Sequence, residues 1–245
     1  MRKSTYTAIK FTIVTVLTAG AIVGLILSMT TKTSMVELDP DLPVKGVDVS
    51  SHNGDIDFDT LRSQGIRFAL IKATEGSTFK DPAFHANYRK ARQSGLKTGA
   101  YHFFRFETPG HMQAINLLNS VRGRDLDFPL IIDVEEWGNP YIRPTVEITD
   151  ELNAMISHLK SAGYPVMLYT NKDGHARFIQ GRFDNIPLWI CSFSAPPAET
   201  GWALWQYTHK GDLRGVRGKV DLNAFSGSDE DFETWVDSNR PPTQY

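Results

Sequence analysis

The sequence predicts an α/β protein built on an irregular, flattened β/α barrel, and two observations point to this fold class. From Val44 onward, short apolar runs alternate with stretches of helical periodicity, which is typical of β/α units around a parallel sheet. In the second half of the chain the apolar runs follow one another too closely to leave room for a helix between each pair. A regular eightfold barrel therefore does not fit, and we expect fewer helices on that side.

The individual elements follow from this alternation. We predict strands near residues 45–50, 67–73, 98–104, 129–135, 165–170, 187–192, 203–207 and 219–222. Helices are predicted near residues 57–64, 82–95, 110–122, 146–162 and 173–180. Gly65, Gly95 and Gly163 stand where three of these helices should end, because the left-handed residue after a helix favours glycine.

Composition limits the classes of function. The chain has 245 residues, of which 41% are hydrophobic and 22% charged, enough for one sizeable core. A net charge of −2 and the absence of a dense basic stripe exclude nucleic acid as an expected partner. The single cysteine, Cys191, cannot form an intramolecular disulfide, and its apolar neighbours indicate a buried, inert thiol.

The N-terminal segment indicates a membrane. Basic residues at the start of the chain precede Phe11 to Met29, a run without charge that is close to the roughly 20 residues needed to cross a bilayer. Acidic residues follow the run, so the positive-inside rule places the rest of the chain outside the cytoplasm. We expect an uncleaved anchor. The alternative is a secreted protein released after signal cleavage near Ala19 to Ala21.

The apolar run from Pro129 to Ile132 leads directly into Asp133 and Glu135. Because side chains alternate along a strand, these two acids should face the same side, with Cα atoms roughly 6.5 to 7 Å apart. Two carboxyls held side by side can separate their pKa values, so that one is charged while the other keeps a proton near neutral pH. Glycoside hydrolysis needs this division of labour. Considered alone, the pair also fits a strand that ends in solvated acids.

Other predicted strands end in polar or aromatic side chains as well, among them Asp48, Tyr101, Tyr169, Trp205 and Asp221. In a parallel barrel the carboxyl ends of all strands open on one face, where active sites are built. Several acids placed together on that face repel one another unless a substrate or proton sharing offsets the repulsion. The sequence therefore predicts an active site at this end of the barrel.

These residues lie in motifs that resemble the signature of glycoside hydrolase family 25, the lysozymes that act as N-acetylmuramidases. The matching runs are Asp48 to Gly54, Leu70 to Gly76, Tyr101 to Phe103, Asp133 to Glu135, Leu168 to Thr170, Trp205 to Tyr207 and Val220 to Asn223. The resemblance covers nearly everything from Val44 to Phe225. It implies a flattened barrel without cofactor or metal that cleaves β-1,4 bonds between N-acetylmuramic acid and N-acetylglucosamine in peptidoglycan.

The resemblance also implies roles for single residues. Glu135 would be the general acid, and Asp133 would assist the substrate's own 2-acetamido group. Asp48 would complete the catalytic set, while Asp221 would bind substrate. Tyr101, Tyr169 and Trp205 would contact the sugars with their ring faces and polar tips. Glu75 belongs to the signature too, but a structural pairing with Lys72 explains it equally well.

Two other functions are compatible with these residues. One is a glycan-binding barrel without turnover, although a proton donor beside an anion favours catalysis. The other is a chitinase-like glycosidase, although Phe128 and Ile131 stand where that family has two further aspartates. A metal site at His52 and His102 is not expected, because neither histidine has ligands at close spacing.

We divide the chain into four parts on this basis. Residues 1–31 are the cytoplasmic basic end and transmembrane anchor, and residues 32–43 are a linker. Residues 44–226 are the family 25-like catalytic domain. Residues 227–245 are a C-terminal tail with a short acidic helix and a proline-rich end. The expected partners are peptidoglycan strands and, through the anchor, the membrane.

Overall fold

The computed structural model describes residues 42–139, 143–194, 197–198 and 201–242. The predicted anchor Phe11 to Met29 lies outside these residues. Within them, no helix combines the length and the apolar character that a membrane span requires.

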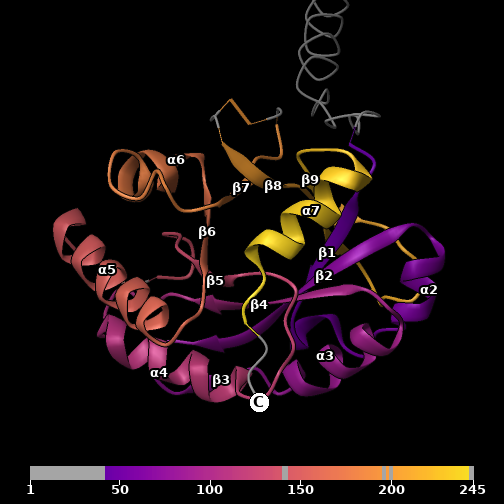
Figure 1. Ribbon diagram of the computed structural model, residues 1–245, viewed down its shortest axis with the longest axis horizontal. Coiled ribbons are helices and arrows are strands. Elements are labelled where there is room, and N and C mark those ends of the chain that lie inside the picture. The colour runs from indigo at the N-terminus through magenta and orange to yellow at the C-terminus, as the bar shows by residue number, and fades with distance from the viewer. Residues whose placement is uncertain (1–41, 140–142, 195–196, 199–200, 243–245) are drawn as a thin grey trace, which may run out of the picture. The chain divides into compact units, whose positions relative to one another are not determined.

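Nine strands form one sheet in the described part of the chain, and eight of them close into a barrel (Figure 1). Their order around the barrel is β1-β9-β8-β7-β6-β5-β4-β2, and β1 pairs with β2 to complete the ring. Their bounds are β1 Lys45–Val49, β2 Ile66–Glu75, β4 Lys97–Phe103, β5 Leu130–Asp133, β6 Val166–Asn171, β7 Leu188–Cys191, β8 Trp202–Gly211 and β9 Val220–Phe225. All eight predicted strands are confirmed. Neighbours are parallel except at β9, which runs antiparallel to both β1 and β8.

The ninth strand was not predicted. β3 (Phe79–Lys80) turns back on the end of β2 and pairs with it antiparallel, through Thr74 and Glu75. β2 therefore extends beyond the barrel, and this short hairpin stands beside the carboxyl end of β2.

Helices cover the first half of the barrel more fully than the second (Figure 1). Their bounds are α2 Phe58–Ser63, α3 Phe84–Gln93, α4 Gly110–Val121, α5 Thr145–Ser161 and α6 Lys172–Gly174, which continues into a π-helical turn, η2, at His175–Ile179. A short 3-10 turn, η1 (Ser51–Asn53), follows β1, and α7 (Asp229–Asn239) comes last. Each predicted helix is present, and the described residues between β7, β8 and β9 contain no helix. The predicted imbalance between the two halves is confirmed.

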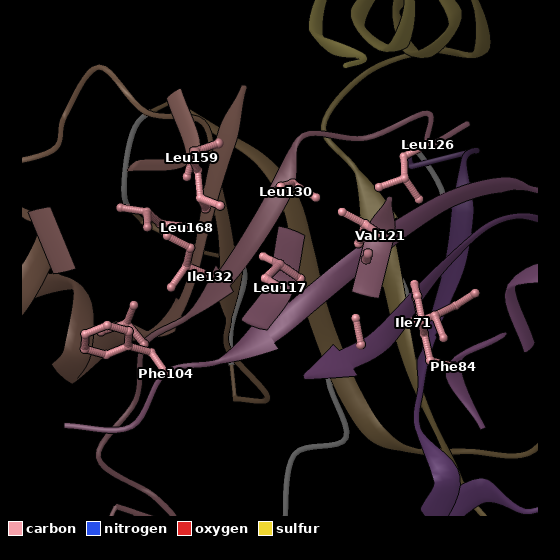
Figure 2. Close-up of a cluster of buried hydrophobic side chains, with 14 of the residues drawn as sticks. Ile71, Phe84, Phe104, Leu117, Val121, Leu126, Leu130, Ile132, Leu159 and Leu168 are labelled. Carbon is pink, nitrogen blue, oxygen red and sulfur yellow. The ribbon is translucent and has the colours of Figure 1, made fainter. Parts of the chain in front are cut away.

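The main core lies between the outer face of the strands and these helices. Figure 2 shows Ile71, Leu130, Ile132 and Leu168 from the strands facing side chains of the helices that cover them. The helical partners include Phe84 of α3, Leu117 and Val121 of α4, and Leu159 of α5. Burial of these apolar side chains away from water is the dominant favourable contribution to the free energy of folding.

A second cluster fills the inside of the barrel. Its inward-facing side chains include Phe68, Phe128, Met167 and Trp189. Helix α7 follows the range predicted for the catalytic domain, yet its Phe232 is fully buried in this same cluster. The ring of Phe232 lies 5.7 Å from that of Phe68 and 6.1 Å from that of Phe128. The barrel is thus a packed core, with α7 closing one end and the polar strand ends at the other.

Candidate active site

Four acidic side chains gather at the end of the barrel where the parallel strands finish. Asp48 lies on β1, Asp133 is the last residue of β5, and Glu135 follows two residues later. Asp221 lies at the start of β9, which runs the other way, and it pairs directly with Asp48 across the strands. The charges of these carboxyls act on one another. The fold therefore brings together all four acids that the sequence predicted.

Burial and the negative charges of neighbouring carboxyls raise the pKa values of these acids. Burial and then the charge of Asp221 raise the pKa of Asp48 from 3.8 to about 8. Burial and then the charge of Asp48 raise the pKa of Glu135 from 4.5 to about 7. Burial and then Glu135 raise the pKa of Asp221 from 3.8 to about 6. Carboxyls with raised pKa values keep their protons to higher pH than ordinary acids do, which general acid catalysis requires.

Asp133 differs from its neighbours because one of its oxygens has no partner. Its Oδ1 is buried and accepts no hydrogen bond from any described residue. Burial and then the charge of Glu135 raise the pKa of Asp133 well above its ordinary value. The family resemblance implied that Glu135 is the general acid and that Asp133 assists the substrate. In the structure the pKa values of both carboxyls are raised, chiefly by burial, and Oδ1 of Asp133 has no donor among the described residues.

Two side-chain amides fix the orientation of Asp48. Gln206 Nε2 and Asn223 Nδ2 each donate a hydrogen bond of 2.8 Å to Asp48 Oδ2. Gln206 in turn accepts a bond of 2.8 Å from the Tyr169 hydroxyl, and Asn223 accepts one of 2.9 Å from Trp189 Nε1. These bonds to the carboxyl lower its pKa and so offset part of the effect of burial.

The two predicted tyrosines both lie in the site, but only one of them has a hydroxyl that is not already bonded to a neighbouring side chain in the described part of the chain. Tyr101 is partly exposed, and burial followed by the charges of Asp48 and Asp133 raises the pKa of its phenol. The ring of Tyr169 packs on Trp189, with 4.3 Å between ring centroids, and its hydroxyl is already bound to Gln206. Tyr101 therefore remains a candidate for substrate contact, whereas Tyr169 supports the amide network around Asp48.

Trp205 does not lie on the side of β8 that faces the four acids. Side chains alternate along β8, and Gln206 faces the inside, so Trp205 faces the outside. It is 2% exposed, clusters with Tyr207 and Ala224, and donates from Nε1 to the Ser192 carbonyl at 2.9 Å. The predicted sugar contact at Trp205 is therefore corrected, since the ring belongs to the outer core of the barrel.

This arrangement of acids on a barrel of this topology agrees with a known family. The family model of the glycosyl hydrolases of family 25 matches residues 47–216. The chain belongs to glycosyl hydrolase family 25. The resemblance seen in the sequence motifs is thereby confirmed, and the protein is a glycoside hydrolase.

Relatives and solved structures of family 25 support this assignment. YegX from Escherichia coli is 32% identical over 214 residues, which cover 84% of this chain and 78% of that protein. Lysozyme M1 from Streptomyces globisporus is 34% identical over 203 residues, covering 76% of this chain and 68% of that protein. A family 25 glycosyl hydrolase from Bacillus anthracis matches with a TM-score of 0.75 and 35% identity, over 83% of this chain and 98% of that one.

In this family 25 enzyme, Glu75 of the signature motif has structural partners. Its carboxylate accepts a bond of 2.7 Å from Lys72 Nζ and one of 3.4 Å from Arg105 Nη1. The Lys72 ammonium also lies over the ring of Phe103, 5.2 Å from the centroid. The positive charge of Lys72 lowers the pKa of both Asp133 and Glu135. Glu75 is thus a structural acid, and the positive charge of Lys72 acts on both Asp133 and Glu135.

The remaining reactive side chains have structural explanations. His102 is fully buried, bonded through Nδ1 to Thr74 at 2.7 Å and through Nε2 to Gln113 at 2.9 Å. Burial lowers the pKa of His102 to about 4, so its ring is neutral. Burial raises the pKa of Cys191 to about 12, so this thiol is a poor nucleophile. In the described ranges, no three His, Cys, Asp or Glu side chains are grouped as a metal site.

Sequence reasoning did not identify Gln206 and Asn223 as site residues. Asn223 could have been predicted from the sequence, because it lies two residues from Asp221 on the same strand and must face the same side. Gln206 had no such signal. Both faces of β8 are apolar, so the sequence alone did not decide whether Trp205 or Gln206 faces the inside.

Proposed function

We propose that this glycoside hydrolase is an N-acetylmuramidase, which cleaves the β-1,4 bond between N-acetylmuramic acid and N-acetylglucosamine in peptidoglycan. Its similarity to Lysozyme M1 supports this activity. The observation that carries the proposal is the buried, unpartnered Oδ1 of Asp133 beside Glu135. Both sugars of peptidoglycan carry a 2-acetamido group, whose N–H is the donor that this oxygen lacks.

Glu135 is the proposed general acid. Its pKa of about 7 keeps a large share of this carboxyl protonated at neutral pH, ready to protonate the leaving glycosidic oxygen. Burial is the main cause of this value, and the charge of Asp48 is the second cause. After the bond breaks, the Glu135 carboxylate removes a proton from the incoming water and is restored.

Asp133 is proposed to assist the acetamido group. When the N–H donates to Oδ1, the hydrogen bond stabilises the Asp133 anion and lowers its pKa. The anion then orients the group, so that its carbonyl oxygen attacks the anomeric carbon as the glycosidic bond breaks. The charge of Asp133 in turn raises the pKa of Glu135. Substrate binding thus establishes the charged Asp133 and protonated Glu135 that catalysis needs.

Asp221 and Tyr101 are the proposed substrate-binding residues, with Asp48 completing the catalytic set. Asp221 and Tyr101 are each partly exposed, and the charges of Asp48 and Asp221 act on the Tyr101 phenol. Carboxylates and a phenol suit sugar hydroxyls, which both donate and accept hydrogen bonds. Tyr169, also predicted to bind substrate, is proposed to act through Gln206 instead.

The test is digestion of purified peptidoglycan by the full chain, with identification of the new reducing end. A muramidase produces muramic acid there, a chitinase-like enzyme produces glucosamine, and a glycan-binding protein yields no product. Glu135→Gln should lower turnover by roughly 10² to 10⁴-fold, because the amide has no proton to deliver. Binding to the insoluble wall should persist.

The matched control is Glu136→Gln at the neighbouring position. Glu136 is exposed and pairs with Arg177 on the surface, so its substitution should leave turnover near that of the wild type. Glucosamine at the new reducing ends would reject the muramidase. Wild-type turnover in Glu135→Gln would remove this residue as the acid.

We also propose that Phe11 to Met29 anchors the protein in the membrane, with the domain that begins near Val44 outside the cytoplasm. The charge pattern around this run supports the orientation. Val44 is fully buried and its carbonyl accepts a 3.0 Å bond from Phe225, which supports a domain start near this residue. Membrane fractionation with N-terminal sequencing tests the proposal. A mature protein that starts beyond Ala21 and is recovered in the medium would contradict it.

A further inference from the structure

The segment that carries Glu135 lies beyond the last strand bonds of β5. Val134 is fixed to β6, since its N–H donates to the Tyr169 carbonyl at 2.8 Å and its carbonyl accepts from Thr170 Oγ1 at 2.6 Å. β5 itself ends at Asp133. The sheet therefore aligns Asp133 directly, whereas other contacts must fix Glu135.

One side chain supplies most of these contacts. Asn139 Nδ2 donates to the carbonyl of Glu135 at 2.8 Å and to the carbonyl of Phe104 at 3.1 Å. Its Oδ1 accepts from the Phe106 N–H at 3.1 Å. Both N–H groups of the amide and its oxygen are thus used on backbone atoms. Asn139 joins the Glu135 segment to the segment that follows β4.

Arg105 makes a second connection between the same segments. Its Nη1 donates to the Gly138 carbonyl at 2.6 Å and to Glu75 at 3.4 Å. The backbone of Arg105 is itself fixed, because Gln113 of α4 accepts from its N–H at 2.8 Å and donates to its carbonyl at 2.9 Å. The connection therefore reaches from α4 to the residues that follow Glu135.

We propose that Asn139 and Arg105 are positioning residues, which together hold the backbone of the Glu135 segment so that the carboxyl meets the glycosidic oxygen. The inference rests on the proposed role of Glu135 as general acid. Displacement of a catalytic group by about 1 Å can cost on the order of 100-fold in rate. Loss of a connection that touches the Glu135 carbonyl itself should have an effect of this kind.

The test compares Asn139→Ala with Gln64→Ala in the full chain. Gln64 is a matched control, since its amide also makes three hydrogen bonds to backbone atoms and joins two segments through Thr60 and Arg214. Asn139→Ala should lower kcat by roughly 10 to 100-fold with KM nearly unchanged. Gln64→Ala should lower stability similarly and retain wild-type kcat.

The pH profile provides a readout that loss of stability alone does not move. Burial is the main cause of the raised pKa of Glu135, and a loosened segment admits water to the carboxyl. The alkaline limb of kcat/KM should therefore shift to lower pH in Asn139→Ala and stay in place in Gln64→Ala. Arg105→Met should act in the same direction. Arg105→Lys should recover part of the activity, because lysine can still donate to the Gly138 carbonyl.

Each outcome decides something. Equal losses of kcat in Asn139→Ala and Gln64→Ala, or an unshifted pH limb, would overturn the inference. If Asn139→Ala does not fold, the comparison of Arg105→Met with Arg105→Lys decides, and equal kcat in the two overturns it. A normal kcat in Asn139→Ala while Glu135→Gln is inactive would reject the positioning role alone. An active Glu135→Gln would reject the proposed function first.

Discussion

Replacement of Asp48 by asparagine should stabilise the protein at alkaline pH and at the same time reduce its activity. The carboxyl is 6% exposed and its pKa rises from 3.8 to about 8 on folding. Below pH 4 it is protonated in both the folded and the unfolded chain, so its contribution to stability is intact. As pH rises from 4 to 8, the unfolded chain releases the proton while the folded chain holds it, and stability is lost.

The size of the effect follows from the shift. The rise of the pKa from 3.8 to about 8 corresponds to a loss of roughly 5 to 6 kcal/mol at pH 8 and above. The variant has no proton to lose and avoids this loss. Its amide oxygen can still accept from Gln206 and Asn223, but more weakly than a carboxylate does. We therefore expect the stability of Asp48→Asn relative to the wild type to be about 4 kcal/mol more favourable at pH 8 than at pH 4.5.

Urea unfolding followed by tryptophan fluorescence measures this difference at pH 4.5, 6 and 8. The control is Asp55→Asn, whose side chain is 90% exposed and pairs with Lys90 on the surface. Its effect should be below about 1 kcal/mol at every pH. The reasoning is refuted if Asp48→Asn is less stable than the wild type at pH 8, or if its gain is independent of pH.

Three further outcomes follow from the structure. Activity on peptidoglycan should fall as pH rises through about 7, where Glu135 loses its proton; activity that stays constant between pH 5 and 9 would contradict this role of Glu135. Gly110→Ala should lower the free energy of unfolding in urea by about 3 kcal/mol or more, because the new Cβ would lie 1.8 Å from the Glu151 carbonyl oxygen of α5. The control is Gly163→Ala, whose Cβ would meet no atom within 4 Å and which should lower it by about 1 kcal/mol. A chain that ends at residue 226 should fail to fold, since it lacks Phe232 and Val236 of the inner core; soluble, active protein of this length would disprove that dependence.

The elements of the fold were predictable because each carries its own local signal. Apolar runs of strand length and glycines at helix ends located every barrel strand and the helices between them. Asp133 and Glu135 were predictable for the same reason, since one strand and its end hold both. The β3 hairpin gave no signal, because two residues are too few for a periodic pattern.

The supporting shell of the site was harder to predict, since it depends on which face of a strand turns inward. Outer and inner faces of this barrel are both apolar, so hydrophobicity did not distinguish Trp205 from Gln206. Nor did the sequence reveal that Asp133 would lack a donor. That property depends on every neighbour of its Oδ1 and is visible only when the strands are in register.

The hydrogen bond between Asn223 and Asp48 joins residues that are 175 positions apart. Such a contact forms late during folding, because a long loop must close before it provides any stabilisation. During synthesis, β1 leaves the ribosome without its partner β9 and has only β2 to pair with. Asp48 receives both of its amide partners only after residue 223 has emerged. The four acids and their amide partners are therefore brought together only when translation of the domain is nearly complete, and we expect a nascent chain to lack activity before then.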